Sequence, residues 1–546
     1  MQGKKTFKDE KELLFSLSAH VPEHNFYRRL KQQLDLGFLT ELTRGYYGKC
    51  GQQSIDPVVF FKLCLVGYLE NITSDRRLIE HCSLRLGLLY FLDYQLDEPL
   101  PWHSTVSRTR QLFPEALFES LFDRVFSLCV EAGMVSGSTQ TIDSAPVKAN
   151  ASVDSLLLKQ PQESVQQQET GKRHSKPAQL ITAPAHQLRK LGKHQENIRG
   201  TFTSLGSTHE KAQLVSNKTH YSPHDPDARI SVKPGKARKL NYHCSMVVDT
   251  AKGVISHIRA DFADGLDSQH LPSLVMQVQK RLRENGLLMQ ELLADTGYSN
   301  GSNYFMLEQQ GITGWIPVFG MYKPEIEGFP YDKEKDRYIC PMGKPLPFKG
   351  FDRTADGRLT KNYWAAPGDC RQCSSKPSCA PKTRCRKITR TAYDEQYLRA
   401  YGRQHSRQGK RMKKLRQSTV EPVFGSLVHH YGLRKVGVLG KSGAHKVMLM
   451  AAAAFNIRKY MRNRPKKSVS MATAMEREQP HAPVFSFTPA AYQQSIVCSQ
   501  NKSCKEDRLS LVVQQPRGFC GTVQTALRIS AAECGSLLGG HAFALL

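Results

Sequence analysis

Three acidic residues could contribute carboxylates to a site: Asp143, Asp295 and Glu421. Asp143 follows strand-forming residues in "TQTIDSAP", and Asp295 follows the short apolar run of "LLADTG". Asp is a poor strand residue, and a charge at the end of a half-buried strand is costly unless it is solvated or bound. Taken singly, each Asp is explained by a turn that caps its strand. Glu421 alone is explained by a place near a helix N-terminus, with Pro422 in the first turn.

The combination of the three acids favours a shared site. Ligands gather where the strands of α/β sheets end, so Asp143 and Asp295 are expected at one sheet edge, with Glu421 reaching them from a later helix. Carboxylates are hard oxygen ligands that suit Mg²⁺ or Mn²⁺, and such ions also bind phosphate oxygens. A pair of these ions can activate an attacking oxygen and stabilise a leaving one. The sequence thus predicts a metal-dependent centre for phosphodiester chemistry.

A second group of metal-ligating residues lies in a Cys-rich stretch, with Cys340 upstream of it. The Cys-x2-Cys pair supports tetrahedral zinc, but the other spacings are not those of a standard two-knuckle ribbon. Reduced cysteines in a small insertion are the alternative to a structural Zn²⁺. The candidate zinc ligands are Cys370, Cys373, Cys379 and Cys385.

Clusters of basic residues predict contacts with phosphate. The run from Arg399 to Arg416 contains no acid, whereas a merely solvated helix face usually mixes both signs. In "STVSRTRQLF", Arg108 and Arg110 lie exposed near a helix start, which suits a helix-turn-helix-like DNA module and a plain helical bundle nearly as well. The expected DNA-binding residues are Arg108, Arg110, Arg403, Arg407, Lys410, Arg411, Lys413, Lys414 and Arg416.

The elements that position these residues form an α/β protein. Apolar spacing of three and four predicts helices over residues 9–130, and "DP" at 56–57 marks a helix start. Strands and helices alternate over 136–320, with a hairpin around "DTAKG", which predicts a mixed sheet. The helix of Glu421 is expected to begin near residue 418, after the basic run.

The chain divides by composition into five parts. A helical N-terminal domain, 1–130, precedes the first part of the catalytic core, 136–320, which contains an exposed or partly disordered polar insertion at 155–215. A Cys-rich insertion, 321–390, is followed by the basic segment and two helices over 391–465. No fold is expected for the tail, 466–546.

The overall charge points to a polyanionic partner. Lys and Arg number 77 against 49 Asp and Glu, for a formal net charge of +28. Such an excess opposes compactness unless nucleic acid or an anionic membrane neutralises it. No apolar run is long enough for a membrane span and no signal peptide is evident, so we expect a cytoplasmic protein with reduced cysteines.

The ordered motifs resemble those of the DDE transposases of bacterial insertion sequences, which have a ribonuclease H-like catalytic core. The resemblance covers roughly residues 50–462 and is carried by "TIDSAPVKANAS", "HDPDARI", "YHCSMVVDTAKGVI", "LLADTGYSN", "CPMGKPL", "CRQCSSKPSC" and "VEPVFGSL". It implies that Asp143, Asp295 and Glu421 are the catalytic triad. Related branches place an Arg and a Lys around the Glu, but Arg416, His429 and Lys435 match that pattern only loosely.

The resemblance implies a reaction, partners and cofactors. Water would attack first and release a 3′-hydroxyl at the transposon end, and that hydroxyl would then attack double-stranded target DNA. The enzyme would use Mg²⁺ or Mn²⁺, with two ions, and act as a homo-oligomer on paired ends. The resemblance also implies a bacterial, nucleoid-associated location in the cytoplasm. A catalytically silent DNA-binding descendant and a nuclease without strand transfer are the alternatives.

Several nearby polar residues are weaker candidates. Asp225 and Asp227 in "HDPDARIS" are explained by a turn more simply than by catalysis. His243, His270 and Tyr298 are possible neighbours of the site without an assigned role.

Overall fold

The computed structural model describes residues 15–48, 54–161, 181–201, 215–231, 239–320, 322–354 and 357–463. The tail expected at 466–546 lies outside the described residues, so its prediction stays untested. Within the described ranges, no helix is both long and apolar enough to cross a membrane.

The N-terminal segment is helical, as expected. Asp56 caps the central helix α4 by accepting hydrogen bonds from the backbone N–H groups of Val58 (2.6 Å) and Val59 (3.4 Å), and Pro57 occupies the first turn. Almost every residue of α4 is buried, so the other helices pack around it. The elements are α1 Leu17–His20, α2 Phe26–Gln33, α3 Phe38–Thr43, η1 Arg44–Tyr46, α4 Pro57–Leu69, α5 Asp75–Ser83, α6 Leu86–Leu92, α7 His103–Leu112 and α8 Glu115–Glu131.

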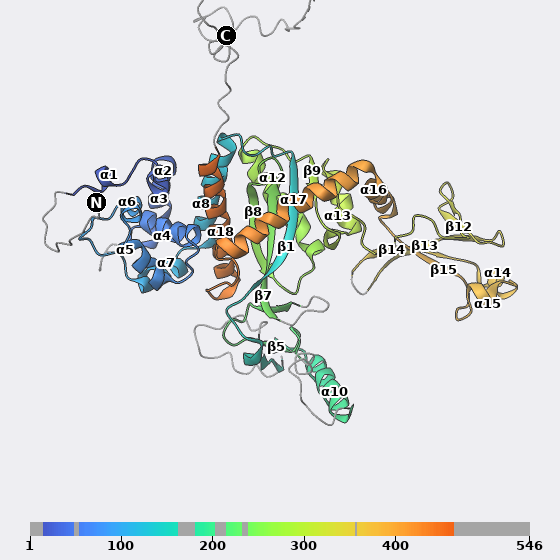
Figure 1. Ribbon diagram of the computed structural model, residues 1–546. Helices are drawn as coiled ribbons and strands as arrows, with labels where there is room; N and C mark the ends of the chain where they lie inside the picture. The colour runs from blue at the N-terminus through green and yellow to red at the C-terminus, as the bar shows by residue number, and fades with distance from the viewer. Residues whose placement is uncertain are drawn as a thin grey trace, which may run out of the picture. The chain divides into compact units, whose positions relative to one another are not determined.

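A mixed sheet follows, with the strand order β10-β9-β1-β7-β8 and the short β6 also paired to β7 (Figure 1). The strands β1, β7 and β8 are antiparallel, whereas β9 and β10 run parallel to β1. Three antiparallel strands extended by two parallel ones form a ribonuclease H-like core, so the predicted α/β fold class is confirmed. The elements are β1 Thr139–Lys148, β6 Arg229–Ser231, β7 Lys239–Asp249, β8 Ile255–Phe262, α12 Asp267–Glu284, β9 Glu291–Leu293, η4 Thr296–Tyr298, α13 Gly301–Gln309 and β10 Thr313–Trp315.

Three further helices complete the core: α16 Asp394–His405, α17 Arg407–His430 and α18 Gly440–Arg462. The run Ala451–Ala454 of α18 is buried, and its small side chains allow close contact with α8 and β8 (Figure 1). Asn456 extends the sheet, because its side chain accepts a hydrogen bond from the Ile255 N–H (2.9 Å) and donates one to the Ile255 carbonyl (2.8 Å).

The Cys-rich segment forms its own antiparallel sheet in the order β11-β12-β13-β14-β15. A small separate core that includes Tyr338, Leu346, Tyr363 and Cys385 stabilises it. Its elements are β11 Tyr331–Asp332, β12 Arg337–Ile339, β13 Pro345–Arg353, β14 Leu359–Trp364, α14 Pro367–Arg371, α15 Lys376–Cys379 and β15 Lys387–Thr391.

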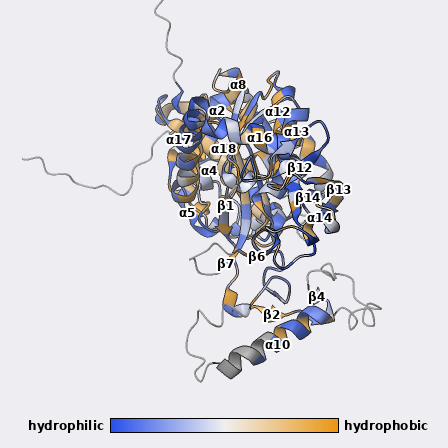
Figure 2. Cartoon of the chain, turned by 90° about the vertical axis from the view of Figure 1, so that its right-hand side faces the viewer, coloured by the Kyte–Doolittle hydropathy of each residue, from blue (hydrophilic) through white to orange (hydrophobic). Residues whose placement is uncertain are grey.

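The polar insertion at 155–215 contains more structure than its composition suggested. Helix α10, Ala185–Thr201, is rich in Gln, Lys and Arg, which are good helix formers, and contains no Pro. Hydrophilic and hydrophobic residues both appear along it (Figure 2). Short elements accompany it: η2 Val153–Ser155, β2 Leu157–Leu158, β3 Gln160–Pro161, β4 Thr182–Ala183 and β5 His220–Tyr221.

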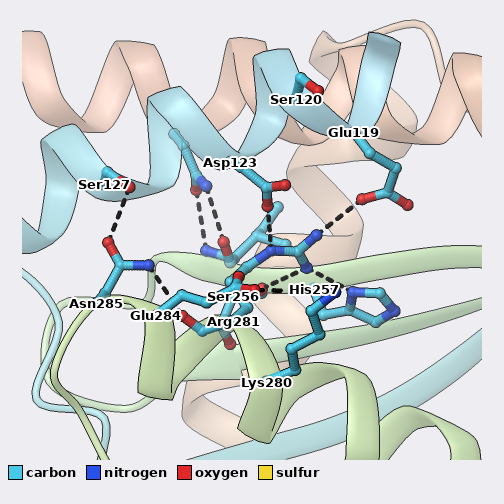
Figure 3. A network of polar contacts seen from close by, with 12 residues as sticks. Glu119, Ser120, Asp123, Ser127, Ser256, His257, Lys280, Arg281, Glu284 and Asn285 are labelled. Atoms are coloured by element: carbon cyan, nitrogen blue, oxygen red, sulfur yellow. Dashed lines mark hydrogen bonds and ion pairs between the residues drawn. The ribbon is translucent and has the colours of Figure 1, made fainter. Parts of the chain in front are cut away.

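A polar network around the buried Arg281 joins the N-terminal helices to the sheet (Figure 3). The guanidinium of Arg281 on α12 donates to Glu119 of α8 (2.7 Å) and to Nδ1 of His257 on β8 (2.6 Å), and it also pairs with Asp123 of α8. His445 of α18 lies 2.8 Å from the other Glu119 oxygen. One continuous hydrophobic core surrounds these groups, so α8 and α18 belong to the packing of the sheet.

Candidate active site

Asp143 lies within strand β1 and does not end it, contrary to expectation. Antiparallel pairing with β7 continues from Gln140 to Lys148, which carries the strand past Asp143, Ser144 and Pro146. Strand β9, in contrast, pairs with β1 only over Thr139–Thr141. From Ile142 to Val147 no described strand pairs with this edge of β1, and only Lys148 is paired again, in a bridge with Lys435; this gap explains how a proline is tolerated at 146. Asp143 therefore lies where the sheet opens.

The register of β1 and β9 brings Asp143 and Asp295 together. Thr141 pairs with Leu293, and each Asp follows its paired residue by two positions (143 − 141 = 2 and 295 − 293 = 2). Equivalent positions on neighbouring parallel strands face the same side at a spacing of about 4.8 Å. Asp295 lies just past the end of β9, as expected, and its Oδ1 accepts the Gly297 N–H (2.9 Å) to cap η4.

Helix α17 brings Glu421 to the same place through Arg416. The Arg416 Nη1 atom lies 3.0 Å from Asp143 Oδ2, and its Nη2 atom lies 3.6 Å from Glu421 Oε1. The side chains of Asp143 and Arg416 are 19% and 13% exposed, whereas that of Glu421 is 57% exposed. Thus Arg416 joins two of the three predicted carboxylates and is itself shielded from solvent.

The start of α17 was predicted wrongly. The helix begins at Arg407, after the Ser406 N-cap, and includes the basic run, because nothing between Arg407 and Ser418 breaks a helix. Glu421 therefore lies well inside the helix, and its neighbour Pro422 is an interior proline. A favourable charge near a helix N-terminus no longer explains Glu421.

Burial raises the pKa of Asp143 above its ordinary value, and the nearby charge of Asp295 adds to this effect. The Ser144 N–H and the Arg416 guanidinium oppose the shift. A carboxylate that resists ionisation next to a second carboxylate is one that a cation would stabilise.

A fourth carboxylate, Asp267, was missed from the sequence. It stands in the first turn of α12, where an acid is ordinary, so nothing in the sequence marks it. Its Oδ1 accepts a hydrogen bond from Ser144 Oγ (2.8 Å) and lies 3.4 Å from His243 Nε2. A Cβ atom on Gly297 would lie 2.7 Å from Asp267 Oδ2 and 3.0 Å from Asp295 Oδ1. Glycine at 297 therefore lets two carboxylates approach each other.

The weaker candidates separate into neighbours and structural groups. The ring of His243 lies 4.9 Å from that of His270, and Tyr298 is buried in η4 directly after Asp295. Asp225 and Asp227 contact the start of α18 instead. Asp225 accepts a hydrogen bond from the Gly440 N–H (3.1 Å), and Asp227 accepts one from the Lys441 N–H (3.0 Å). Both acids thus satisfy donors at a helix start.

The three acids offer oxygen ligands of the type that a hard divalent cation binds. Asp143, Asp295 and Glu421 supply carboxylate oxygens, and the Arg416 guanidinium already places positive charge between two of them. As they stand, no three His, Cys, Asp or Glu residues of the described ranges are close enough to hold an ion. Binding would therefore require side-chain rearrangement around Arg416.

The basic residues of α17 form two stripes. Arg407, Arg411 and Lys414 are exposed along one stripe. The other stripe, Lys410, Lys413 and Arg416, lines a cleft together with Asp295 and with Arg403 of α16.

The two arginines predicted in the N-terminal domain differ. Arg108 is exposed, as expected. Arg110 is not: its side chain is 18% exposed and makes a two-point ion pair with Asp75 (2.8 and 2.7 Å), which ties α7 to α5. The expectation of an exposed Arg110 was wrong, because the sequence did not show its partner.

The candidate zinc ligands lie in the Cys-rich segment, where no three described cysteines are close enough to hold an ion as they stand. Cys385 is buried in its core, with Cys340, Cys370 and Cys379 packed against that core. Backbone N–H groups point at two sulfurs, from Lys344 to Cys340 Sγ (3.3 Å) and from Arg386 to Cys370 Sγ (3.5 Å). The cysteines named here, and Cys373, are free thiols. Zinc binding stays a prediction.

Comparisons with known proteins identify two segments. Residues 15–112 match the family model "Transposase domain (DUF772)", and residues 339–461 match the family model "Transposase DDE domain". The second match contains Glu421, whereas Asp143 and Asp295 lie between the two matched segments. A comparison with curated proteins finds no match.

Among solved structures, the chain is similar to a piggyBac transposase synaptic complex with hairpin DNA. The identity is 10%, the TM-score is 0.23, and the similarity covers 84% of each chain.

Proposed function

We propose that this chain, which belongs to the DDE transposases, cuts DNA at transposon ends and joins the released ends to target DNA. The observation that carries the proposal is the Arg416 bridge from Asp143 to Glu421, together with the β1–β9 pairing, which ends two residues before Asp143 on one strand and two residues before Asp295 on the other. These contacts support a site formed by three acids that are far apart in the chain, once their side chains rearrange around Arg416.

In the proposed mechanism, Asp143, Asp295 and Glu421 would hold divalent ions. When bound, Mg²⁺ or Mn²⁺ would favour attack on the phosphodiester and stabilise the leaving oxygen. Arg416 neutralises charge between Asp143 and Glu421, which limits their repulsion before DNA arrives. The cationic stripe of α17 would position the DNA backbone, since phosphate contacts fix register and do not read sequence.

We further propose that the enzyme acts as a homo-oligomer on both transposon ends. A strand-transfer reaction that joins two ends to one target requires an active site at each end. The excess positive charge of the chain supports binding to DNA in general, and Arg108 on the N-terminal helices is an exposed candidate contact.

The test is a joining assay with the purified full chain, Mg²⁺, labelled duplexes that cover the DNA flanking the gene, and a supercoiled target plasmid. Joined products support the proposal. Cut products without joining would identify a nuclease. DNA binding without either reaction would identify a catalytically inactive DNA-binding protein derived from a transposase.

The Asp143→Asn variant is expected to lose cutting and joining by at least about 1,000-fold while binding the end duplex normally, because it removes a ligand and no phosphate contact. Asp352→Asn, a change at an exposed Asp in the Cys-rich sheet, is the matched control and should behave like the wild type. Retained joining by Asp143→Asn would refute the assignment.

A further inference from the structure

A cleft of about 500 Å³ opens beside Asp295. Its walls come from the end of β10, the end of α16 and the first half of α17, and Arg416 closes the side nearest Asp143. Binding pockets for compact ligands measure about 300–1,000 Å³, so this cleft has room for one nucleotide unit and none for a duplex.

The lining of the cleft has two chemically different parts. Trp315, Ile316 and Pro317, at the end of β10, form the apolar part of the lining, and Met412 of α17 adds to it. The cations come from α16 and α17, and Asp295 is the single acid of the lining. The cationic members are Arg403, Lys410, Lys413 and Arg416. A lining that combines apolar residues of one element with cations of two others matches the two parts of a nucleotide, a flat base and a phosphate.

The apolar part of the lining is held in a fixed position. The indole Nε1 of Trp315 donates a hydrogen bond to Glu291 Oε1 (3.0 Å), which fixes the ring on the sheet edge. The Val318 N–H donates to Gln404 Oε1 (2.9 Å), which ties the segment after β10 to α16. An aromatic ring oriented before binding loses little entropy when a base stacks on it.

Arg416 pairs with Asp143 and Glu421, but the other three cations of the cleft form no ion pair among the described residues. Arg403 is half-buried, and burial lowers its pKa from the ordinary value. Its Nε atom is buried with no hydrogen-bond partner. Along the described parts of the chain, Lys410 and Lys413 form no ion pair, in contrast to Arg399, which pairs with Glu308 (2.7 Å). A half-buried guanidinium without a direct ion pair is unfavourable, so an anionic ligand would stabilise this part of the lining.

We propose that this cleft binds one unpaired nucleotide of the substrate DNA, with its base against Trp315 and its phosphate among Arg403, Lys410 and Lys413. The inference rests on the proposed function, because it takes DNA as the ligand. It adds that a strand must be unpaired next to the scissile phosphate, since Asp295 lines the same cleft.

The experiment measures binding without catalysis, in EDTA. The chain has three tryptophans, so a Trp102→Phe/Trp364→Phe background leaves Trp315 as the fluorescent reporter. The probes are a single-stranded octamer of thymidine, the same octamer with abasic sites in place of bases, a blunt duplex and free thymidine monophosphate. Stacking on Trp315 should quench its fluorescence with the intact octamer alone.

Substitutions then separate the two parts of the lining. Trp315→Ala should weaken binding of the octamer about tenfold and leave binding of the abasic strand unchanged. Trp315→Phe should keep most of the difference in affinity between the intact and the abasic octamer. Lys410→Gln/Lys413→Gln should reduce the quenching. It should also lower the slope of log K against log[salt] by about 0.7 for each lysine removed. The matched control, Arg407→Gln/Lys414→Gln on the outer stripe of α17, should lower the salt dependence and leave the quenching intact.

Equal binding of intact and abasic strands, unchanged by Trp315→Ala, would overturn the nucleotide site. Free thymidine monophosphate that binds as tightly as the octamer would overturn the assignment to a DNA strand. Neither result depends on joining activity, so failure of this inference and failure of the proposed function are distinguishable.

Discussion

Arg416 is the residue on which the geometry of the acids depends. Its guanidinium lies 3.0 Å from Asp143 and 3.6 Å from Glu421, so a single positive charge serves two carboxylates. A divalent ion bound to those carboxylates would compete with Arg416 for the same oxygens. Arg416 thus keeps the acids close in the absence of metal and opposes metal binding at the same time.

The Arg416→Gln variant is therefore expected to bind Ca²⁺, a non-reactive probe, about tenfold more tightly than the wild type. Isothermal titration calorimetry would measure this difference. Arg411→Gln, an exposed change on the same helix, is the control and should leave the affinity unchanged. Weaker Ca²⁺ binding by Arg416→Gln would mean that Arg416 mainly orients the carboxylates.

At the level of residues, the sequence predicted the acids better than their partners. Asp143 and Asp295 were found because a charge next to strand-forming residues is unusual. Asp267 and the bridging role of Arg416 were missed, because both depend on which strands pair and on how far α17 extends. The catalytic roles of the three acids stay predictions.

At the level of elements, the junction of α16 and α17 sets the shape of the cleft. A Cβ atom on Gly409 would lie only 2.0 Å from the carbonyl oxygen of Arg403. Backbone cannot move aside as a flexible side chain can, so glycine is required for this close approach.

Gly409→Ala is expected to destabilise the junction by about 1–3 kcal/mol and to widen the cleft. Faster amide hydrogen exchange over the end of α16 and the start of α17 would reveal the destabilised junction. The control is Gly402→Ala in α16, where a Cβ atom meets nothing within 4 Å. That change should stabilise the helix by up to about 1 kcal/mol. Unaltered exchange in Gly409→Ala would contradict the requirement for glycine.

Elements with strong periodicity were predicted well, and those defined by pairing were not. The N-terminal helices, the hairpin and the helices after β8 follow from apolar spacing and turn residues. Strand β1 was expected to stop at Asp143, yet pairing with β7 overrides the weak strand preference of "DSAP". The sheet of the Cys-rich segment was not predicted, since Pro and Gly interrupt its longest strand, β13, and two of the other strands are only two or three residues long.

At the level of the whole molecule, the Arg281 network links the N-terminal helices to the ribonuclease H-like sheet. The five-part division by composition stays a prediction, and one continuous hydrophobic core crosses its first boundary. A buried arginine shared by Glu119, Asp123 and His257 is stable only while all partners stay in place. Movement of α8 relative to the sheet would therefore expose unpaired charge.

This network also makes stability depend on pH. Burial, followed by the charge of Arg281, lowers the pKa of His257 well below its ordinary value of 6.5. In the unfolded chain, His257 binds a proton near pH 6.5, whereas in the folded chain it stays neutral at that pH. The free energy of unfolding therefore falls as the pH drops below about 6.5.

The expected loss from His257 is at most about 1.4 kcal/mol for each pH unit below that point. His257→Asn keeps an acceptor near the position of Nδ1 and cannot take up a proton, so its stability should depend less steeply on pH. Differential scanning calorimetry between pH 7.5 and 5.5 would measure both proteins, with the exposed change His429→Asn as the control. If His257→Asn loses stability with acid as steeply as the wild type, the buried histidine is not the source of the acid sensitivity, and the link between α8 and the sheet must titrate elsewhere.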